Sequence, residues 1–281
     1  MWYAQREQSA GRWRILALWL VYRVFGKHAV NILLWPIFLF IYPWCKPARA
    51  ALAQYYRVAG VPPRPFRHLL AFAQSMMDKT DACTLCRNPP RFTVSGDAGW
   101  DRGGAFLVST HLGCIEVLPA LQMRRPTGSP PAVHAFQQLG HDAIFTSLFV
   151  KHLGGRFHLH AVEDIGVETA AGMQENIRRG DLVIMAGDRV SAGRADSMKP
   201  PPVYRREFFG RQCAFPKGVF VFARLMECPV FAIDCVKTGF NSYEVRTKRL
   251  GGDLVSDFVR FLESETRLFP YQWFQFFPFF D

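Results

Sequence analysis

The segment Ser109–Glu116 combines a histidine and a carboxylate at a spacing that can support acid–base chemistry. His111 follows a short apolar run, and Glu116 lies five residues later. On one continuous α-helix the two side chains would diverge by roughly 140°. They can meet if His111 occupies a turn at the end of a strand, relaxed by Gly113, and Glu116 lies in the following helix. We therefore expect Glu116 to accept a hydrogen bond from one imidazole nitrogen, while the other nitrogen takes a proton from a substrate hydroxyl or amine.

The same spacing has simpler explanations, because a histidine and a glutamate in this pattern arise easily by chance. His111 could cap backbone groups at a strand end while Glu116 is a solvated helix residue, and the spacing alone favours neither interpretation. Cys114 could act as a nucleophile, since the first turn of a helix can lower a thiol pKa. No other feature supports a covalent mechanism, and no G-x-S-x-G motif is present.

The elements that would position these residues follow from the apolar periodicity of the chain. From about Phe92 onward, short strand-like runs alternate with segments of helical periodicity. This alternation predicts an α/β fold with a mostly parallel sheet flanked by helices on both faces. Residues 190–214 read as a long loop. The expected strands are 105–110, 132–136, 156–160, 181–186, 229–236 and 243–249, and the expected helices are 66–77, one from about residue 114, 142–152, 162–179, 217–226 and 253–268.

Residues 1–60 form an apolar segment that we expect to be helical and membrane-associated, followed by an α/β domain over 61–281. Ile15–Tyr22 is one apolar block, and Ala29–Trp44 is a longer, uncharged block that contains Pro36. A helix over the longer block would span about 24 Å, less than the roughly 30 Å hydrocarbon core of a bilayer. Flanking arginines and tryptophans favour an interfacial helix pair or a re-entrant hairpin. A buried helical hairpin is the alternative.

The net charge of +11, from 34 Lys and Arg against 23 Asp and Glu, indicates an anionic partner. The basic residues are scattered and often stand beside apolar ones, which favours a membrane surface or a phosphate-bearing partner over nucleic acid. We expect no metal and no cofactor. The C-x-x-C pair Cys83 and Cys86 lacks a second pair at zinc-binding spacing, and His134, His158 and His160 are more typical of structural histidines.

The strand–His-x4-Glu–helix segment resembles the first signature block of the lysophospholipid-acyltransferase superfamily. More narrowly, the chain resembles the bacterial lipid A biosynthesis (lauroyl/myristoyl) acyltransferase family. Three further segments are similar and occur in the same order. GDLVIMAGDRV, 180–190, resembles the strand and acidic turn of that family, FFGRQCAFPKGVFVFARLMECPVFAID, 208–234, resembles its Gly…Pro-x-Gly helix and following strand, and FPYQWFQFFPFF, 269–280, resembles its C-terminal Pro-x-Gln-Trp block.

This resemblance implies an acyltransferase with a fold of the glycerol-phosphate acyltransferase type. The donor would be an acyl thioester, on acyl carrier protein or coenzyme A, and the acceptor a hydroxyl or amine of a membrane-bound lipid or glycolipid. The family implies a place at the bacterial inner membrane, with the active site facing the cytoplasm. It assigns His111 as general base and Glu116 as its partner.

The resemblance also suggests residues that bind the substrates. Asp188 and Arg189 would lie at the carboxyl end of a strand, where open α/β sheets bind ligands. Arg189 could bind a phosphate or stabilise negative charge, or it could pair with Asp188 or Glu207. Trp273 and Phe276 would pack or touch the membrane. The substrate-binding candidates are Gly113, Asp188, Arg189, Gly210, Pro216, Lys217 and Gly218, of which Gly210, Pro216 and Gly218 would shape the pocket wall and Lys217 could meet an anion or remain solvated.

The chain departs from the lipid A enzymes at two places. Asp188-Arg189 stands where they typically have Asp-Gln, and their Arg-rich segment is not evident in residues 135–145. The Gly-Asp-Arg-Val version is more similar to acyltransferases found with aryl-polyene or related pigment-lipid synthesis, so acylation of such a pigment lipid is an alternative. Two other classes stay open: a catalytically inactive membrane-surface binding protein, and a hydrolase that uses water as acceptor.

Overall fold

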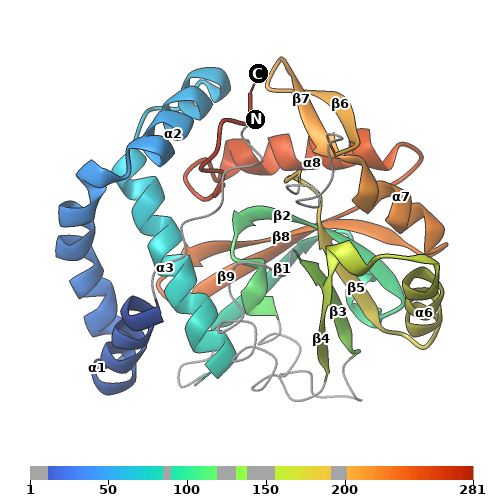
Figure 1. Ribbon diagram of the computed structural model, residues 1–281, viewed down its shortest axis with the longest axis horizontal. Coiled ribbons are helices and arrows are strands. Elements are labelled where there is room, and N and C mark those ends of the chain that lie inside the picture. Colours follow the sequence, from blue (N-terminus) through green and yellow to red (C-terminus); the bar gives the residue numbers. More distant parts are fainter. Residues whose placement is uncertain (1–11, 85–89, 119–130, 138–155, 191–200, 281) are drawn as a thin grey trace.

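The computed structural model describes residues 12–84, 90–118, 131–137, 156–190 and 201–280 of the chain (Figure 1). A sheet lies at the centre, and helices flank it. The described elements are α1 (Arg12–Ile41), η2 (Tyr42–Trp44), α2 (Lys46–Ala59), α3 (Pro65–Thr84), β1 (Arg91–Gly96), η3 (Trp100–Arg102), β2 (Ala105–Gly113), η4 (Ile115–Val117), β3 (Val133–Gln137), β4 (Phe157–Ala161), η5 (Val162–Asp164), α6 (Val167–Arg178), β5 (Leu182–Ala186), β6 (Val203–Phe208), β7 (Arg211–Pro216), α7 (Lys217–Leu225), β8 (Val230–Gly239), β9 (Ser242–Arg249) and α8 (Leu254–Leu268).

The central sheet has seven strands in the order β1-β9-β8-β2-β5-β3-β4. Every neighbouring pair is parallel except the β8–β9 hairpin. The prediction of a mostly parallel α/β sheet flanked by helices is therefore confirmed. Strands β2 and β8 lie in the middle and read as nearly continuous buried apolar runs, as expected for strands covered on both faces.

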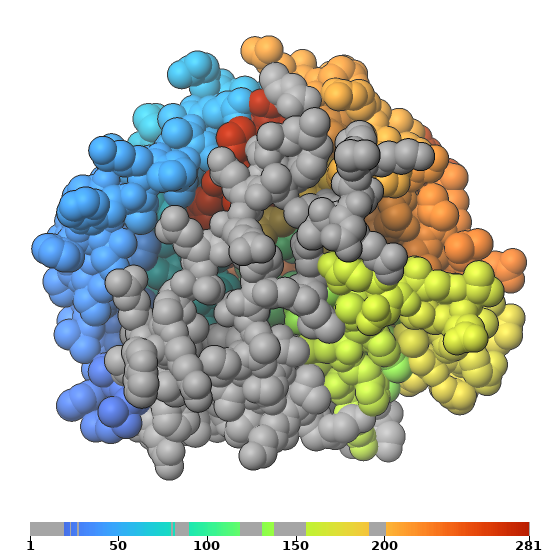
Figure 2. Space-filling view, viewed as in Figure 1, coloured from blue at the N-terminus to red at the C-terminus, as the bar shows by residue number. Residues whose placement is uncertain are grey.

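Two buried apolar clusters lie against the sheet. The larger cluster combines side chains of β2, β5 and β8 with residues of α2, α6, α7 and α8. On the other face, Cys114 and Tyr243 belong to the second cluster, and both contact α3, through Ser75 and Asp78. In Figure 2 the N-terminal helices, in blue, form one side of the molecule and α6 and α7 the opposite side. The carboxyl end of β2 is therefore contacted both by α3, through Ser75, and by the C-terminal residues 272–274.

Strands β6 and β7 form an antiparallel hairpin outside the central sheet. The two residues of its turn, Phe209 and Gly210, have φ values of 51° and 70°. Two consecutive residues with positive φ are typical of the tight turns that suit a β-hairpin. The prediction of one long loop over 190–214 was therefore wrong from Val203 onward, while 191–200 lies outside the described residues.

The six expected strands are confirmed, and their ends differ from the expected ones by no more than three residues. The expected helices near 66–77, 162–179, 217–226 and 253–268 are confirmed as α3, α6, α7 and α8, although a short turn, η5, replaces the start of α6. Where a helix was expected from about residue 114, β2 runs on to Gly113, the single turn η4 follows, and a helix is described only at Leu118, because residues 119–130 lie outside the described part of the chain. The helix expected over 142–152 lies outside the described residues.

The N-terminal helices turn sharply twice. Gly26 breaks α1 with a φ of 76° and a ψ of 177°, between the two apolar blocks of the sequence. The part from His28 to Trp44 then meets α2 at 89°. No single helix of the described residues has the length and apolarity of a membrane span, although this bent pair does when its two parts are taken together. Large apolar side chains of this region are exposed, among them Phe40 at 80% and Trp44 at 77%.

Candidate functional site

His111 occupies an irregular carboxyl end of β2. The pairing of β2 with β8 shifts register between Ser109 and Gly113. Gly113 has a φ of 73°, and a Cβ atom there would lie 2.0 Å from the carbonyl oxygen of Cys235. Only glycine allows this close approach. The local geometry leaves the His111 side chain 32% exposed at the edge of a buried sheet.

Asp188 is the hydrogen-bond partner of the His111 ring. Strands β2 and β5 are parallel with Ser109 opposite Ala186, so two further residues along each strand bring His111 beside Asp188. The Nδ1 atom of His111 lies 2.6 Å from Oδ1 of Asp188, and the backbone N–H of His111 donates to Oδ2 at 2.8 Å. A carboxylate only accepts hydrogen bonds, so Nδ1 carries the proton and Nε2 has the lone pair. Nε2 makes no hydrogen bond to the described residues.

Asp188 stays ionised although its side chain is fully buried. Burial acts to raise the pKa of this carboxyl, but the charge and the hydrogen bonds of His111, together with the charge of Arg189, hold the pKa below its usual value. The pair therefore combines a fixed negative charge with a half-exposed imidazole. Such an arrangement fixes the tautomer of a histidine and stabilises its protonated form, which are the two requirements for a general base.

The hydrogen bond expected between Glu116 and His111 is made by Asp188 instead, which corrects the predicted orienting role of Glu116. Glu116 lies in η4 and accepts a hydrogen bond from Lys79 of α3 at 2.9 Å. Burial acts to raise the pKa of Glu116, but Lys79 and, to a smaller extent, His111 lower this pKa to about 2. The physical reason is that β2 continues through Gly113, which turns Glu116 toward α3. Glu116 still contributes a negative charge near the imidazole.

Cys114 is placed as an interior residue rather than a nucleophile. Its side chain is 2% exposed, and the thiol points toward the carbonyl oxygen of Ser75 at 3.5 Å. Burial, reinforced by the charge of Glu116, raises the pKa of the thiol well above its usual value. A buried thiol of raised pKa is a poor nucleophile.

The C-terminal segment 272–275 completes the site by pairing with the carboxyl end of β2. The backbone N–H groups of Gly113 and Phe274 donate to the carbonyl oxygens of Gln272 and His111 at 2.8 and 3.0 Å, so the segment forms a short antiparallel bridge with β2. The indole N–H of Trp273 donates to Oδ2 of Asp188 at 3.2 Å. Trp273 packs, as the sequence suggested, because it is 1% exposed, but it also contacts the carboxylate of the pair.

Arg189 is held by the same segment. Its Nε donates to Oε1 of Gln275 at 3.1 Å, and its Nη2 donates to the carbonyl oxygen of Phe274 at 2.7 Å. The guanidinium also lies over the ring of Phe277. Arg189 therefore joins the turn after β5 to the C-terminal segment and places a positive charge close to Asp188.

The remaining predicted site residues belong to the β6–β7 hairpin and α7. Gly210 lies in the hairpin turn, Pro216 caps α7, and Lys217 and Gly218 begin that helix. Lys217 lies 5.7 Å from the ring of Tyr204. The hydrogen bonds and ion pairs of the described residues do not connect these four positions to His111. The hairpin instead contacts the site through Trp273, because the ring of Phe208 packs against the Trp273 ring with centroids 5.4 Å apart.

His68 is a site residue that the sequence did not indicate. It is fully buried on α3, where Nε2 lies 2.8 Å from the carbonyl oxygen of Trp273 and Nδ1 lies 3.1 Å from the hydroxyl of Tyr56. A carbonyl oxygen only accepts, so Nε2 is protonated and Nδ1 accepts from Tyr56. Burial lowers the pKa of His68 to about 4, and the bond to Trp273 only partly offsets this effect.

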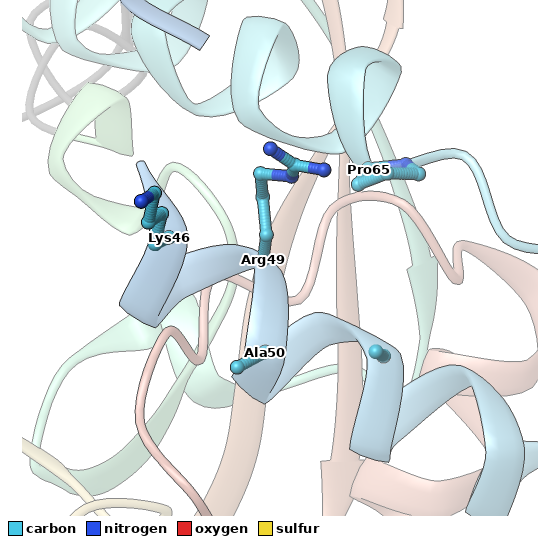
Figure 3. Close-up of a pocket in the computed structure, with 5 residues that line it drawn as sticks. Lys46, Arg49, Ala50 and Pro65 are labelled. Atoms are coloured by element: carbon cyan, nitrogen blue, oxygen red, sulfur yellow. The ribbon is translucent and has the colours of Figure 1, made fainter. Parts of the chain in front are cut away.

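Two other features lie away from His111. His134 stacks on His158 and His160 with ring centroids 4.8 and 5.3 Å apart, and no group of three or more His, Cys, Asp or Glu among the described residues could hold a metal ion. A groove of about 510 Å³ lies between α2 and the start of α3 and is lined by Lys46, Arg49, Ala50, Ala53 and Pro65. Figure 3 shows Arg49 extending from α2 toward Pro65. Two of the five lining residues are basic, and the first of them, Lys46, follows the exposed Trp44 by two residues in the sequence.

Comparison with known proteins adds no further assignment: no protein-family model matches the chain, and no curated protein matches it.

Proposed function

We propose that this protein is an acyltransferase that moves a fatty-acyl group from an acyl thioester to a hydroxyl or amine of a membrane-bound lipid or glycolipid. The observation that carries this proposal is the His111–Asp188 pair at the carboxyl end of the parallel sheet, with Nε2 of His111 without a hydrogen bond to the described residues. A base that is oriented by a carboxylate, with a buried Cys114 as neighbour, fits direct attack by the acceptor. The resemblance to the lysophospholipid-acyltransferase superfamily and a fold of its type belong to the same proposal.

In the proposed reaction, Nε2 of His111 takes the proton of the acceptor hydroxyl or amine as the acceptor attacks the thioester carbonyl carbon. The imidazolium is stabilised by the Asp188 carboxylate and by the nearby charge of Glu116. The tetrahedral intermediate then expels the thiolate, which receives the proton from His111. The acyl–sulfur bond is broken, an ester or amide bond is formed, and the protein ends in its starting state. The thioester is already activated, so the step needs no further co-reactant.

The N-terminal region supports a membrane-bound acceptor. Phe40 and Trp44 are exposed on the bent helices, and the basic groove with Lys46 and Arg49 begins two residues after Trp44. Apolar side chains beside cationic ones fit a surface rich in anionic lipid. We therefore propose that α1 and α2 dock on the bacterial inner membrane, with the site facing the cytoplasm. The donor is acyl carrier protein or acyl coenzyme A, both of which are anionic.

The first experiment follows acyl transfer from radiolabelled acyl carrier protein into membrane lipids. We expect His111→Ala and Asp188→Asn each to lower the rate by about 10² to 10⁴, because each removes the oriented base. Glu116→Gln should cost less than Asp188→Asn, since Glu116 acts on the imidazole only by its charge. Glu175→Gln, on the exposed face of α6, is the matched control.

The products separate the competing functions. If the label enters a lipid, the chemical class of that lipid identifies the acceptor, whether it is a membrane lipid, a glycolipid or a pigment lipid. Free fatty acid formed without any lipid would favour a hydrolase. Vesicle binding without turnover, unaffected by His111→Ala, would contradict the proposal and favour a membrane-surface binding protein.

A further inference from the structure

The carboxylate of Asp188 is held by three donors from two segments. Two of them, the backbone N–H and Nδ1–H of His111, belong to β2. The third, the indole N–H of Trp273, comes from the C-terminal segment and shares Oδ2 with the backbone of His111. A buried carboxylate that keeps its charge needs such donors, and the loss of one loosens the remaining geometry.

Trp273 is itself fixed from several sides. Its backbone bridges Leu112, and its ring packs against Tyr55 and Phe279 at 5.3 and 5.1 Å between centroids. Its carbonyl oxygen accepts from Nε2 of His68. His68 in turn accepts from the hydroxyl of Tyr56 on α2, so a chain of hydrogen bonds runs from the N-terminal helices through the C-terminal segment to the candidate base.

We propose that Trp273 and His68 are positioning residues for the His111–Asp188 pair. Trp273 fixes the carboxylate through its indole N–H, and His68 fixes Trp273 through its carbonyl oxygen. The inference rests on the proposed function only for its effect on rate, because the geometry of the pair can be measured without turnover.

The measurement is the water exchange rate of the His111 Nδ1 proton, followed by NMR in the full chain labelled with ¹⁵N-histidine. His111→Gln assigns the signal. Replacement of Trp273 by 3-benzothienylalanine substitutes sulfur for the indole N–H and keeps the bicyclic shape, so the loss is confined to one hydrogen bond. We expect exchange to accelerate by about 10- to 100-fold, the size of a lost hydrogen bond to a charged group.

Matched variants separate positioning from packing. Phe279→Leu disturbs the packing of the Trp273 ring and leaves every donor to Asp188 in place, so exchange should stay within about twofold of wild type. His68→Leu should accelerate exchange, whereas His68→Gln should restore the wild-type rate, because an amide can both donate to Trp273 and accept from Tyr56. Trp273→Phe is a second test of the lost donor.

In the transfer assay, the Trp273 and His68→Leu variants should lower kcat about 10- to 100-fold with KM within about twofold of wild type. The positioning role is overturned if the benzothienyl variant leaves exchange unchanged, or if Phe279→Leu accelerates exchange equally. Should wild type transfer no acyl group, the proposed function fails, while the exchange rates still decide whether Trp273 and His68 hold the pair.

Discussion

Asp234 is a buried carboxyl whose protonation state is determined by its surroundings in the fold. It lies on β8 with no exposed surface, and neither oxygen has a hydrogen-bond partner among the described residues. Burial, with the nearby charge of Glu265, raises its pKa well above the usual value, although Arg246 acts in the opposite direction. A carboxyl in such surroundings takes up a proton rather than remain charged without a partner.

Asp234→Asn should therefore stabilise the protein at neutral pH. The unfolded chain releases the Asp234 proton near pH 4 and the folded chain only at higher pH, so wild type loses stability as pH rises through this window. The amide does not titrate and has nearly the same shape. Urea unfolding at pH 4, 5.5 and 7 should show the advantage of the variant growing with pH. Equal stability of the two proteins at all three values would contradict a protonated Asp234.

At the same scale, the sequence predicted the histidine of the site but not its partner. The apolar run before His111 predicted a histidine at the end of a strand, and the expected placement of Asp188 at a strand end was correct. Glu116 is not the partner of the His111 ring, because the register of two parallel strands, rather than proximity in sequence, determines which carboxylate meets this histidine. That register, Ser109 opposite Ala186, is set by long-range packing that no local pattern contains.

Among the elements, the N-terminal helices have the most unusual surface. Ile32, Phe40 and Trp44 are exposed at 71%, 80% and 77%, whereas α1 packs on α3 through Tyr22, Val30 and Leu34. The sequence predicted the two apolar blocks and a helix pair, but not that the break falls at Gly26 while Pro36 lies inside the helix. It did not predict which side would pack on α3, since the blocks are apolar on all sides.

Phe40→Ser and Trp44→Ser should each weaken binding to vesicles that contain anionic phospholipid by about 10- to 100-fold, the equivalent of about 1.5–3 kcal/mol per large apolar side chain. Vesicle flotation of the purified protein measures the bound fraction. Val167→Ser, at an equally exposed apolar position on α6, is the control and should bind like wild type. If the control loses as much binding as the Phe40 and Trp44 variants, no docking face exists on α1 and η2.

The β6–β7 hairpin shows why short antiparallel elements escape prediction. Its strands are six residues each, and a proline run precedes them. The turn needs a positive φ at Phe209, which a phenylalanine rarely adopts. The packing of Phe208 against Phe215 and Trp273 offsets the cost of this backbone conformation. Tertiary contacts thus determine the element more than its own residues do.

For the whole molecule, the alternation of strands and helices was sufficient to predict the fold class, because covering both faces of a parallel sheet leaves few arrangements. The assembly of the site was not predictable in the same way. His68 and Trp273 are 205 residues apart in sequence, and their contact depends on how α3 and the C-terminal segment close over β2. Helix α3 and the C-terminal segment therefore both contribute to the candidate site, and stability and site geometry are coupled through their contact.

The pH dependence of global stability tests this coupling. His68 has a pKa of about 4 in the folded chain, chiefly because of burial, and near 6.5 when unfolded. In that window acid protonates the unfolded chain first, so stability falls as pH drops from 6.5 to 4 and the loss levels off below pH 4. The difference is equivalent to about 3 kcal/mol. His68→Gln keeps both hydrogen bonds without titrating, so urea unfolding should show wild type losing stability relative to this variant between pH 7 and pH 4. A constant difference between the two proteins over that range would mean that His68 does not link α3 to Trp273 in its neutral, buried form.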